Sequence, residues 1–364
     1  MAIDLYENFL QLVRLGIGHD AYPQSANLNW EAIKSLADVQ GLTAVVLDGI
    51  NSRGKGLEDK IPLQLKLEWI GEVLQNYEQR YKAYENAIGT LAAFYSQHGY
   101  KMMVLKGFAC SLDWPNTKCR PCGDIDIWLF GKQKEADEEL AAWFKIQGSK
   151  ARIDTSHHHH TVFEWQGFTV ENHYDFVNVH AHRSSKELEV IFKKLGQNDS
   201  RSMRDNGENV YVPSPNLHAL FLIRHMANHF ASAEINLRQV LDWAFFVEKH
   251  THEIDWKWLV DVLDKYHMHD FYNCINAICV GDLGFDVKIF PNVQFDPTLK
   301  DKVFKDIIAP EYGNNLPKGF ANRLLFKYRR WKANAWKQEL CYGESRSIGF
   351  WSGVKSHLLK PKTI

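Results

Sequence analysis

The sequence has almost no net charge, few cysteines and no long apolar run. Its 43 lysines and arginines nearly balance 44 acidic residues, leaving a formal net charge of −1. No global field therefore directs the chain to nucleic acid or to a membrane surface. Six cysteines in 364 residues are typical of an intracellular chain without a disulfide framework. Because no stretch approaches the ~18 apolar residues of a membrane span, we expect a cytoplasmic protein with no membrane partner.

Aromatic residues and helix-forming segments are, by contrast, abundant. Aromatics make up 13% of the chain and include 12 tryptophans, which can build large cores. The first residues carry Asp4, Glu7 and Arg14 inside an apolar pattern, which predicts an amphipathic helix and not a secretory signal. We expect residues 1–97 to be a helical region, with a polar loop over 50–60 and a long helical piece over 62–99.

From Lys101 the pattern changes to short β-type runs. KMMVLKG predicts a buried strand ending in a turn, and DIDIWLF predicts a second strand, followed by an amphipathic helix over 132–148. TVFEWQ and FTVENHYDF, separated by Gly167, predict a hairpin. These signals favour an α/β (α+β) fold, with a small mixed-sheet core over 98–209.

The remainder of the chain, 210–364, is expected to be a helical C-terminal domain. VYVPSPN, residues 210–216, has the composition of a linker. Three segments with helical periodicity follow, and Asp255 is placed to cap the third of them.

Two aspartates stand inside the predicted strand CGDIDIW. Because alternate side chains of a strand share one face, Asp124 and Asp126 project together. Ionised carboxylates this close repel each other and are costly to bury unpaired. Mg²⁺ or Mn²⁺ between them would satisfy both, since oxygen ligands favour these ions. The alternative is a solvated strand end, or pairing with Lys106 and Arg120.

A third carboxylate, Glu171, follows on the β-type run FTVENHY. Three acids on neighbouring strands can hold two metal ions, which clamp the attacking and leaving oxygens of a phosphoryl displacement. The sequence therefore points to phosphoryl-transfer chemistry at this place.

The order LKG, R, GDIDIW, VENH resembles the nucleotidyltransferases of the DNA polymerase β superfamily. More narrowly, it is similar to a bacterial family of uncharacterised nucleotidyltransferases, and the resemblance covers residues 60–265. It implies an enzyme of nucleotidyltransferase type that transfers a nucleoside monophosphate from an NTP to a hydroxyl acceptor and releases pyrophosphate. A small molecule, a protein side chain and an RNA end all stay open as the acceptor.

The resemblance also implies catalytic roles for the three acids. Asp124 and Asp126 would be metal ligands. Glu171 would bind one metal ion and help to deprotonate the acceptor hydroxyl. His173, two residues further along the same strand face, would orient a carboxylate or contact the substrate.

Nucleotide-binding roles fall on the turn and the loop before the acids. Gly107 would close the turn where the triphosphate approaches the backbone. Lys106 and Arg120 would offset phosphate charge, with Arg120 suited to bidentate contact. The next residue, Phe108, stands where the wider superfamily usually has glycine or serine. A non-catalytic module that keeps the fold and binds a nucleotide or a partner is therefore the alternative.

Histidines and cysteines elsewhere give weaker signals. The run at 157–160 and the pair His180 and His182 allow a zinc site and a third hypothesis, a histidine-based metal hydrolase, although a polar loop and a solvated strand end are favoured. His225 and His229 share a helix face and are expected to pack. Cys119 and Cys122 have no second such pair, which favours free thiols.

Two charged features complete the expectations. Arg238 and Asp242 are four residues apart on a predicted helix, which predicts a structural ion pair, with a role near the acceptor pocket as the alternative. The basic aromatic stretch over 326–337 suits either nucleic-acid binding or, as favoured, a C-terminal helix with a buried aromatic stripe.

Overall fold

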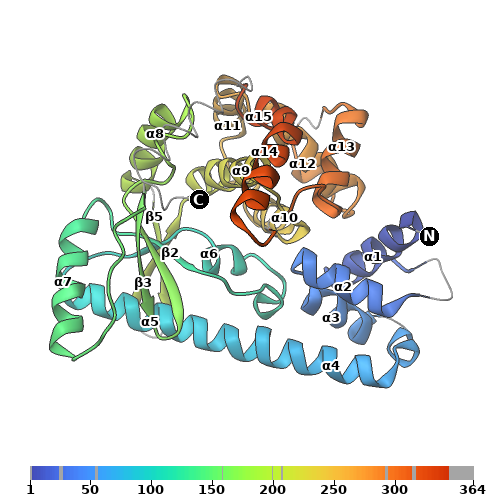
Figure 1. Ribbon diagram of the computed structural model, residues 1–364, viewed down its shortest axis with the longest axis horizontal. Coiled ribbons are helices and arrows are strands. Elements are labelled where there is room, and N and C mark those ends of the chain that lie inside the picture. Colours follow the sequence, from blue (N-terminus) through green and yellow to red (C-terminus); the bar gives the residue numbers. More distant parts are fainter. Residues whose placement is uncertain are drawn as a thin grey trace.

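The computed structural model describes residues 2–23, 28–53, 56–157, 159–198, 200–205, 208–291, 294–313 and 317–343 (Figure 1). His158 of the histidine run and residues 344–364 lie outside this part. The first helices are α1 (Ala2–Gly16), α2 (Trp30–Gln40), α3 (Thr43–Arg53), the 3-10 turn η1 (Leu57–Lys60) and α4 (Leu63–Val73). The helical start predicted from periodicity is confirmed, but the loop over 50–60 is shorter than expected because α3 continues to Arg53.

A long helical rod links the N-terminal helices to the sheet. It consists of α4, a π-helical turn η2 (Leu74–Gln79) and α5 (Arg80–Gln97). Figure 1 shows the rod running from beneath α2 and α3 to the sheet. Trp69 and Tyr77 are buried in the core of the helical regions, whereas Tyr81 and Tyr84 belong to the core beneath the sheet. The π-helical turn therefore lies where the rod passes from one core to the other.

One mixed sheet of six strands forms the centre of the fold. The strands are β1 (Met103–Val104), β2 (Ile125–Trp128), β3 (His160–Trp165), β4 (Phe168–His173), β5 (Ser200–Asp205) and β6 (Glu208–Pro213), in the order β3-β4-β2-β1-β6-β5. The pairs β2–β4 and β1–β6 are parallel, and the others are antiparallel. The predicted α/β class with a mixed sheet is confirmed. The segment expected to be a linker instead begins within β6, because Tyr211 pairs with Met103.

The two faces of the sheet are chemically different. Ile125, Ile127 and Val170 are fully buried against α5 and α7 (Gln133–Ile146). The opposite face carries Asp126 beside Glu171 in register, and it is covered by α8 (Ser185–Asn198) and the helices after it. Alternation along β2 and β4 therefore places the acids on the face turned to the C-terminal helices.

The helices after the sheet are α9 (Pro215–Ser232), α10 (Leu237–His250), α11 (Trp256–Lys265), α12 (His269–Gly281), η4 (Val287–Ile289), α13 (Pro297–Ile308), α14 (Phe320–Ala333) and α15 (Ala335–Tyr342). Asp255 caps α11 as predicted, since its carboxylate accepts from the backbone N–H of Trp258 at 3.0 Å. Among the described helices, none is long and apolar enough to cross a membrane.

The basic aromatic stretch over 326–337 is helical and partly buried, as the favoured interpretation expected. It divides between α14 and α15 at Asn334. Trp336 packs edge-on against Phe230 with ring centroids 5.6 Å apart. Lys337 is buried and ion-paired with Asp306. These contacts give part of the stretch a structural role.

Candidate nucleotide and metal site

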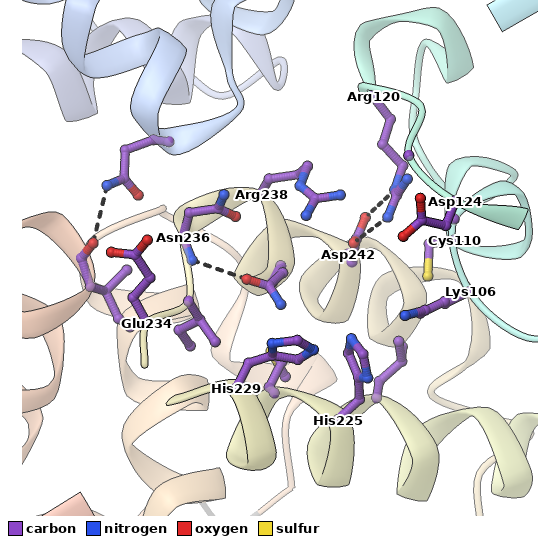
Figure 2. A pocket seen from close by; sticks show the side chains of 18 of the residues that line it. Lys106, Cys110, Arg120, Asp124, His225, His229, Glu234, Asn236, Arg238 and Asp242 are labelled. Carbon is purple, nitrogen blue, oxygen red and sulfur yellow. Dashed lines mark hydrogen bonds and ion pairs between the residues drawn. The ribbon is translucent and has the colours of Figure 1, made fainter. Parts of the chain in front are cut away.

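A pocket of about 320 Å³ lies between the start of β2 and the helices α9 and α10 (Figure 2). One wall comes from the turn after β1 and the start of β2, with Lys106, Gly107, Asp124 and Asp126. The facing wall comes from the helices, with His225, His229, Asn236, Arg238 and Asp242. The pocket thus joins residues that are more than a hundred positions apart.

The turn at Gly107 accepts only glycine without strain. Its backbone has φ 62° and ψ −97°, and a Cβ built there would lie 2.6 Å from the Tyr84 hydroxyl oxygen. That hydroxyl donates to the backbone carbonyl of Asp124 at 2.8 Å. The α5 helix therefore holds the turn and the start of β2 together, and a side chain at position 107 would press on this contact.

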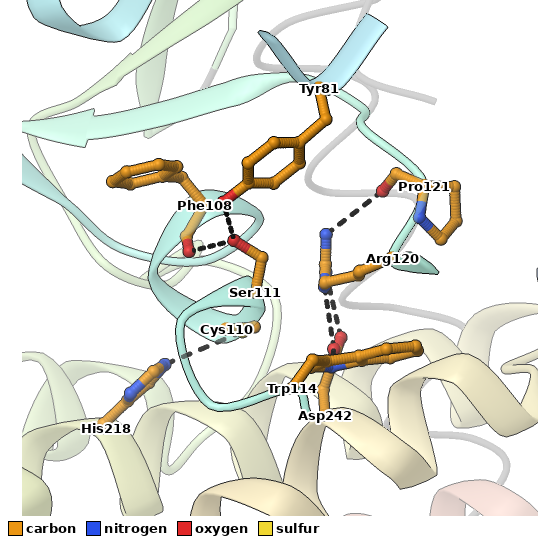
Figure 3. A network of polar contacts seen from close by, with 9 residues as sticks. All are labelled: Tyr81, Phe108, Cys110, Ser111, Trp114, Arg120, Pro121, His218 and Asp242. Carbon is orange, nitrogen blue, oxygen red and sulfur yellow. Dashed lines mark hydrogen bonds and ion pairs between the residues drawn. The ribbon is translucent and has the colours of Figure 1, made fainter. Parts of the chain in front are cut away.

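Phe108 begins the short helix α6 (Phe108–Ser111), and its side chain enters the core beneath the sheet. It is 1% exposed and packs beside Tyr81 and Tyr84, each with a ring-centroid distance of 6.5 Å (Figure 3). The pocket lining includes Lys106 and Gly107 but not Phe108. This packing explains why a large apolar residue follows the glycine.

Asp126, Glu171 and His173 meet on one face of the parallel pair β2–β4. The Oδ1 atom of Asp126 lies 3.0 Å from Lys106 Nζ and 3.1 Å from His173 Nε2. His173 Nε2 is also 3.4 Å from Glu171 Oε2. Asp126, Glu171 and His173 each offer one ligand atom within 4.8 Å of the others. The strands therefore bring together four residues that the sequence singled out.

The charges in this group stabilise one another. Burial opposes the charged form of Lys106, but Asp126 and Glu171 outweigh it and raise its pKa. Burial also opposes ionisation of Glu171, yet the hydrogen bond from His173 and the charge of Lys106 lower its pKa. The pKa of His173 is raised to about 9, since its hydrogen bonds to Asp126 and Glu171 exceed the effect of burial. At neutral pH two cations thus lie among the carboxylates.

Asp124 lines the same pocket but takes a different position from Asp126. It precedes β2, whereas Asp126 lies within the strand and is 1% exposed. Neither of the possible metal-ligand groups found among the described residues includes Asp124. Desolvation, followed by the negative charges of Glu171 and Asp126, raises its pKa. The carboxylates of Asp124, Asp126 and Glu171 therefore outnumber the two cations beside them, Lys106 and His173.

Arg120, predicted to contact phosphate, is engaged by Asp242 of α10. Its Nε and Nη2 donate to the two carboxylate oxygens at 2.7 and 2.9 Å (Figure 3). The indole N–H of Trp114 donates to the same carboxylate at 2.9 Å. Both Arg120 and Asp242 are 5% exposed. The expected ion pair between Arg238 and Asp242 is therefore wrong, because Arg120 takes both oxygens of the carboxylate.

Arg238 points into the pocket without a counter-ion (Figure 2). It makes no hydrogen bond or ion pair with the residues that the structure describes. Burial, followed by the nearby charge of Arg120, lowers its pKa. The i, i+4 spacing favoured an ion pair with Asp242 over a role near the acceptor pocket, because the sequence does not reveal that Arg120, a second buried arginine, competes for Asp242.

The side chains of His225 and His229 of α9 also line the pocket. Their rings lie 4.4 Å apart. Burial, followed by the charge of Lys106, lowers the pKa of both, that of His229 to about 4. Two neutral imidazoles therefore extend the helical wall beside Arg238, where the shared helix face favoured packing or a satisfied polar contact over metal binding.

The remaining candidates separate into distinct places. Cys119, in the 3-10 turn η3 (Thr117–Cys119), and Cys122 are free thiols, as favoured. His182 stacks on Tyr342 with ring centroids 3.6 Å apart and precedes α8, so it lies outside the sheet. His159 and His160, in contrast, lie against His173, with ring centroids 5.4 and 5.1 Å from it.

Comparisons with known proteins identify a family for this chain. The model of a family described as an uncharacterised nucleotidyltransferase matches residues 26–280. A search of curated proteins found no match. Among solved structures, the chain is similar to an antigenic nucleotidyltransferase-like protein from Paracoccidioides brasiliensis, with 11% identity and a TM-score of 0.34 over 57% of this chain and 96% of that one.

Proposed function

Because the chain belongs to the family of uncharacterised nucleotidyltransferases, we propose that it is a metal-dependent enzyme that transfers a nucleoside monophosphate from an NTP to a hydroxyl acceptor. The acceptor oxygen forms a bond to the α-phosphorus, the bond to the bridging oxygen of the β-phosphate breaks, and pyrophosphate leaves. One observation carries the proposal: Asp126 and Glu171 pair in register beside the turn at Lys106 and Gly107.

The acids fit Mg²⁺ or Mn²⁺. Asp126 is fully buried, and its side chain contacts the cations Lys106 and His173. Glu171 offers an oxygen ligand within 4.8 Å of Asp126, Asp124 lines the pocket beside them, and oxygen donors select these ions. Asp124, Asp126 and Glu171 would hold the metal, which when bound supplies charge stabilisation to the phosphoryl group.

The chain's own residues bind and orient the reactants. Gly107 lets a triphosphate approach the backbone without a side chain in the way. Lys106 and the unpaired Arg238 offer positive charge to the phosphates from opposite walls. Arg120 holds the loop against α10 through Asp242, which positions the pocket wall. The ionised Glu171 helps to remove the proton of the acceptor hydroxyl.

A thermal-shift experiment tests the assignment. The melting temperature is measured with each of the four NTPs, with Mg²⁺, Mn²⁺ or chelator, on wild type and on the Asp124→Asn/Asp126→Asn variant. Since a ligand that binds only the folded state stabilises it by mass action, we expect a shift that needs both metal and nucleotide and is lost in the variant. A metal-dependent shift that persists in the variant would refute the site.

Turnover separates the enzyme from the non-catalytic alternative. Pyrophosphate release is measured with the NTP that binds, in the presence of small hydroxylated compounds, protein and RNA as acceptors. Release that needs Asp124, Asp126 and Glu171 supports the proposal. Binding without release under any of these conditions would support a nucleotide-binding module, for which the buried Phe108 in place of a small residue is the motivating feature.

A further inference from the structure

Three histidines converge at the open end of the β3–β4 hairpin. His160 opens β3 and pairs in register with His173, the last residue of β4. His159 precedes His160, and their ring centroids are 4.4 Å apart. Each of the three offers one ring nitrogen within 4.8 Å of the other two. Two nitrogens on one tetrahedral zinc lie about 3.4 Å apart at Zn–N bonds of about 2.1 Å, so small side-chain rotations bring all three into ligand positions.

The cluster contains polar atoms that the fold leaves unsatisfied. The Nδ1 atoms of His159 and His160 are inaccessible to water and have no hydrogen-bond partner among the described residues. His160 as a whole is 7% exposed. A buried nitrogen without a hydrogen-bond partner destabilises the fold, and a bound cation would remove this penalty. The backbone, by contrast, is well anchored, because the carbonyl of His159 accepts from the N–H groups of Tyr174 and Asp175.

We propose that His159, His160 and His173 form a site for a divalent transition-metal ion of the zinc type. Imidazole nitrogens favour zinc and its neighbours, whereas Mg²⁺ prefers oxygen. Three histidines leave one coordination position, and Glu171 lies beside two of them, with Oε1 3.9 Å from His160 Nε2 and Oε2 3.4 Å from His173 Nε2. The site is therefore chemically distinct from the oxygen-ligand site proposed for nucleotidyl transfer.

His173 belongs to both groups of ligands, so the two sites communicate. Its Nε2 atom contacts Asp126 and Glu171. A transition metal bound by His173 displaces the proton that His173 carries at neutral pH, so binding changes the charge beside these two acids and thereby the affinity of the acid group for Mg²⁺. Zinc binding itself does not depend on nucleotidyl transfer and can be measured without nucleotide.

The test uses the full chain produced without a polyhistidine tag, stripped of metal, and titrated with Zn²⁺ in competition with a chromophoric chelator. We expect one tight equivalent in wild type that a hundredfold excess of Mg²⁺ does not displace. His159→Gln and His160→Gln should each weaken zinc binding at least tenfold. The matched control His225→Gln/His229→Gln, a second histidine pair in the same region, and Asp124→Asn should keep it.

Three outcomes would overturn the proposal: no tight equivalent in wild type, undiminished binding in both His159→Gln and His160→Gln, or equal loss in the control pair. Loss in Asp124→Asn would also overturn it, by placing zinc on the carboxylates. Melting curves in chelator check that each variant folds; if His160→Gln does not, His159→Gln, outside the strand, decides. A failed nucleotide shift together with intact zinc binding would reject the proposed enzyme and leave this site standing.

Discussion

The two walls of the pocket differ in how far their charged and polar side chains are paired. On the sheet wall, Lys106 contacts Asp126, which also contacts His173 next to Glu171, whereas Asp124 has no ion pair with a described residue. On the helical wall, Arg238 has no ion pair with a described residue, and the imidazoles of His225 and His229 make no hydrogen bond with one. Contacts among its own charged residues hold the sheet wall in place. The helical wall, in contrast, presents hydrogen-bond donors that a bound ligand would satisfy.

This difference separates residues that hold the site together from residues that recognise what enters it. A buried ion pair loses much when one partner is removed, because the other charge stays buried. An unpaired charge at a pocket destabilises the empty protein and is compensated when an anion binds. The two arginines at this pocket therefore offer a direct comparison.

The largest expected effect is on stability in Arg120→Met. Removing Arg120 leaves Asp242 buried with one neutral donor, which should lower the free energy of unfolding by about 3–5 kcal/mol. Arg238→Met, the same substitution on the other arginine, should change it by less than about 1 kcal/mol or raise it, since no pair is broken. Urea unfolding monitored by tryptophan fluorescence measures both.

Ligand binding should reverse the order of the two variants. Arg238→Met is expected to weaken binding of the stabilising NTP about tenfold or more, in line with the loss of a charge-assisted phosphate contact. Calorimetric titration with Mg²⁺ and that nucleotide checks this. If Arg238→Met binds as tightly as wild type, Arg238 is not a phosphate contact and the contrast between the walls has another cause.

A smaller effect is expected from Gly107→Ala on the sheet wall. The positive φ and the Cβ placed 2.6 Å from the Tyr84 hydroxyl should destabilise the protein by about 1–3 kcal/mol. Tyr84→Phe removes the oxygen that a Cβ would meet, so the double variant should lose less than the sum of the single variants. Additive losses would show that backbone strain alone makes glycine necessary.

The smallest expected effect concerns pH and the helical wall. Since the pKa of His229 is lowered to about 4 in the folded state, its contribution to stability is present above about pH 6.5 and is lost as pH falls toward 4. Relative to His229→Gln, wild type should lose about 2 kcal/mol over this window. Unfolding free energies at pH 7, 5.5 and 4.5 measure it; parallel profiles of the two proteins would contradict the prediction.

The sequence was most informative where local pattern decides structure. Alternation along DIDIW predicted that Asp126 and the isoleucines lie on opposite faces, and the break at Gly167 predicted the hairpin, whose register also sets His160 against His173. Periodicity predicted the helices of both ends. Strand β6 escaped because the segment VYVPSPN, with its two prolines, has the composition of a linker; in the structure β6 pairs with the neighbouring strand β5 and with Met103 of β1.

The sequence could not predict those features of the site that depend on competition between distant residues. Arg238 has a well-spaced acid on its own helix, but Asp242 instead receives two hydrogen bonds from a loop residue, Arg120. The burial of Phe108 likewise depends on packing against Tyr81 and Tyr84 of the rod, which no local sequence pattern connects to the turn. Which charge stays unpaired is a property of the tertiary structure.

The π-helical turn in the rod has a consequence for insertions and deletions. A π-helical turn holds about one residue more than an α-helical turn, so it offsets the angular phase of the helix between Trp69 and Tyr84. Deleting one residue within Leu74–Gln79 would allow a continuous α-helix. Each residue of such a helix advances by about 100°, so one of the two cores would then meet the wrong side of the rod. The π-helical turn thereby keeps each end of the rod turned toward its own core. We expect the rod to tolerate substitutions there more readily than insertions or deletions.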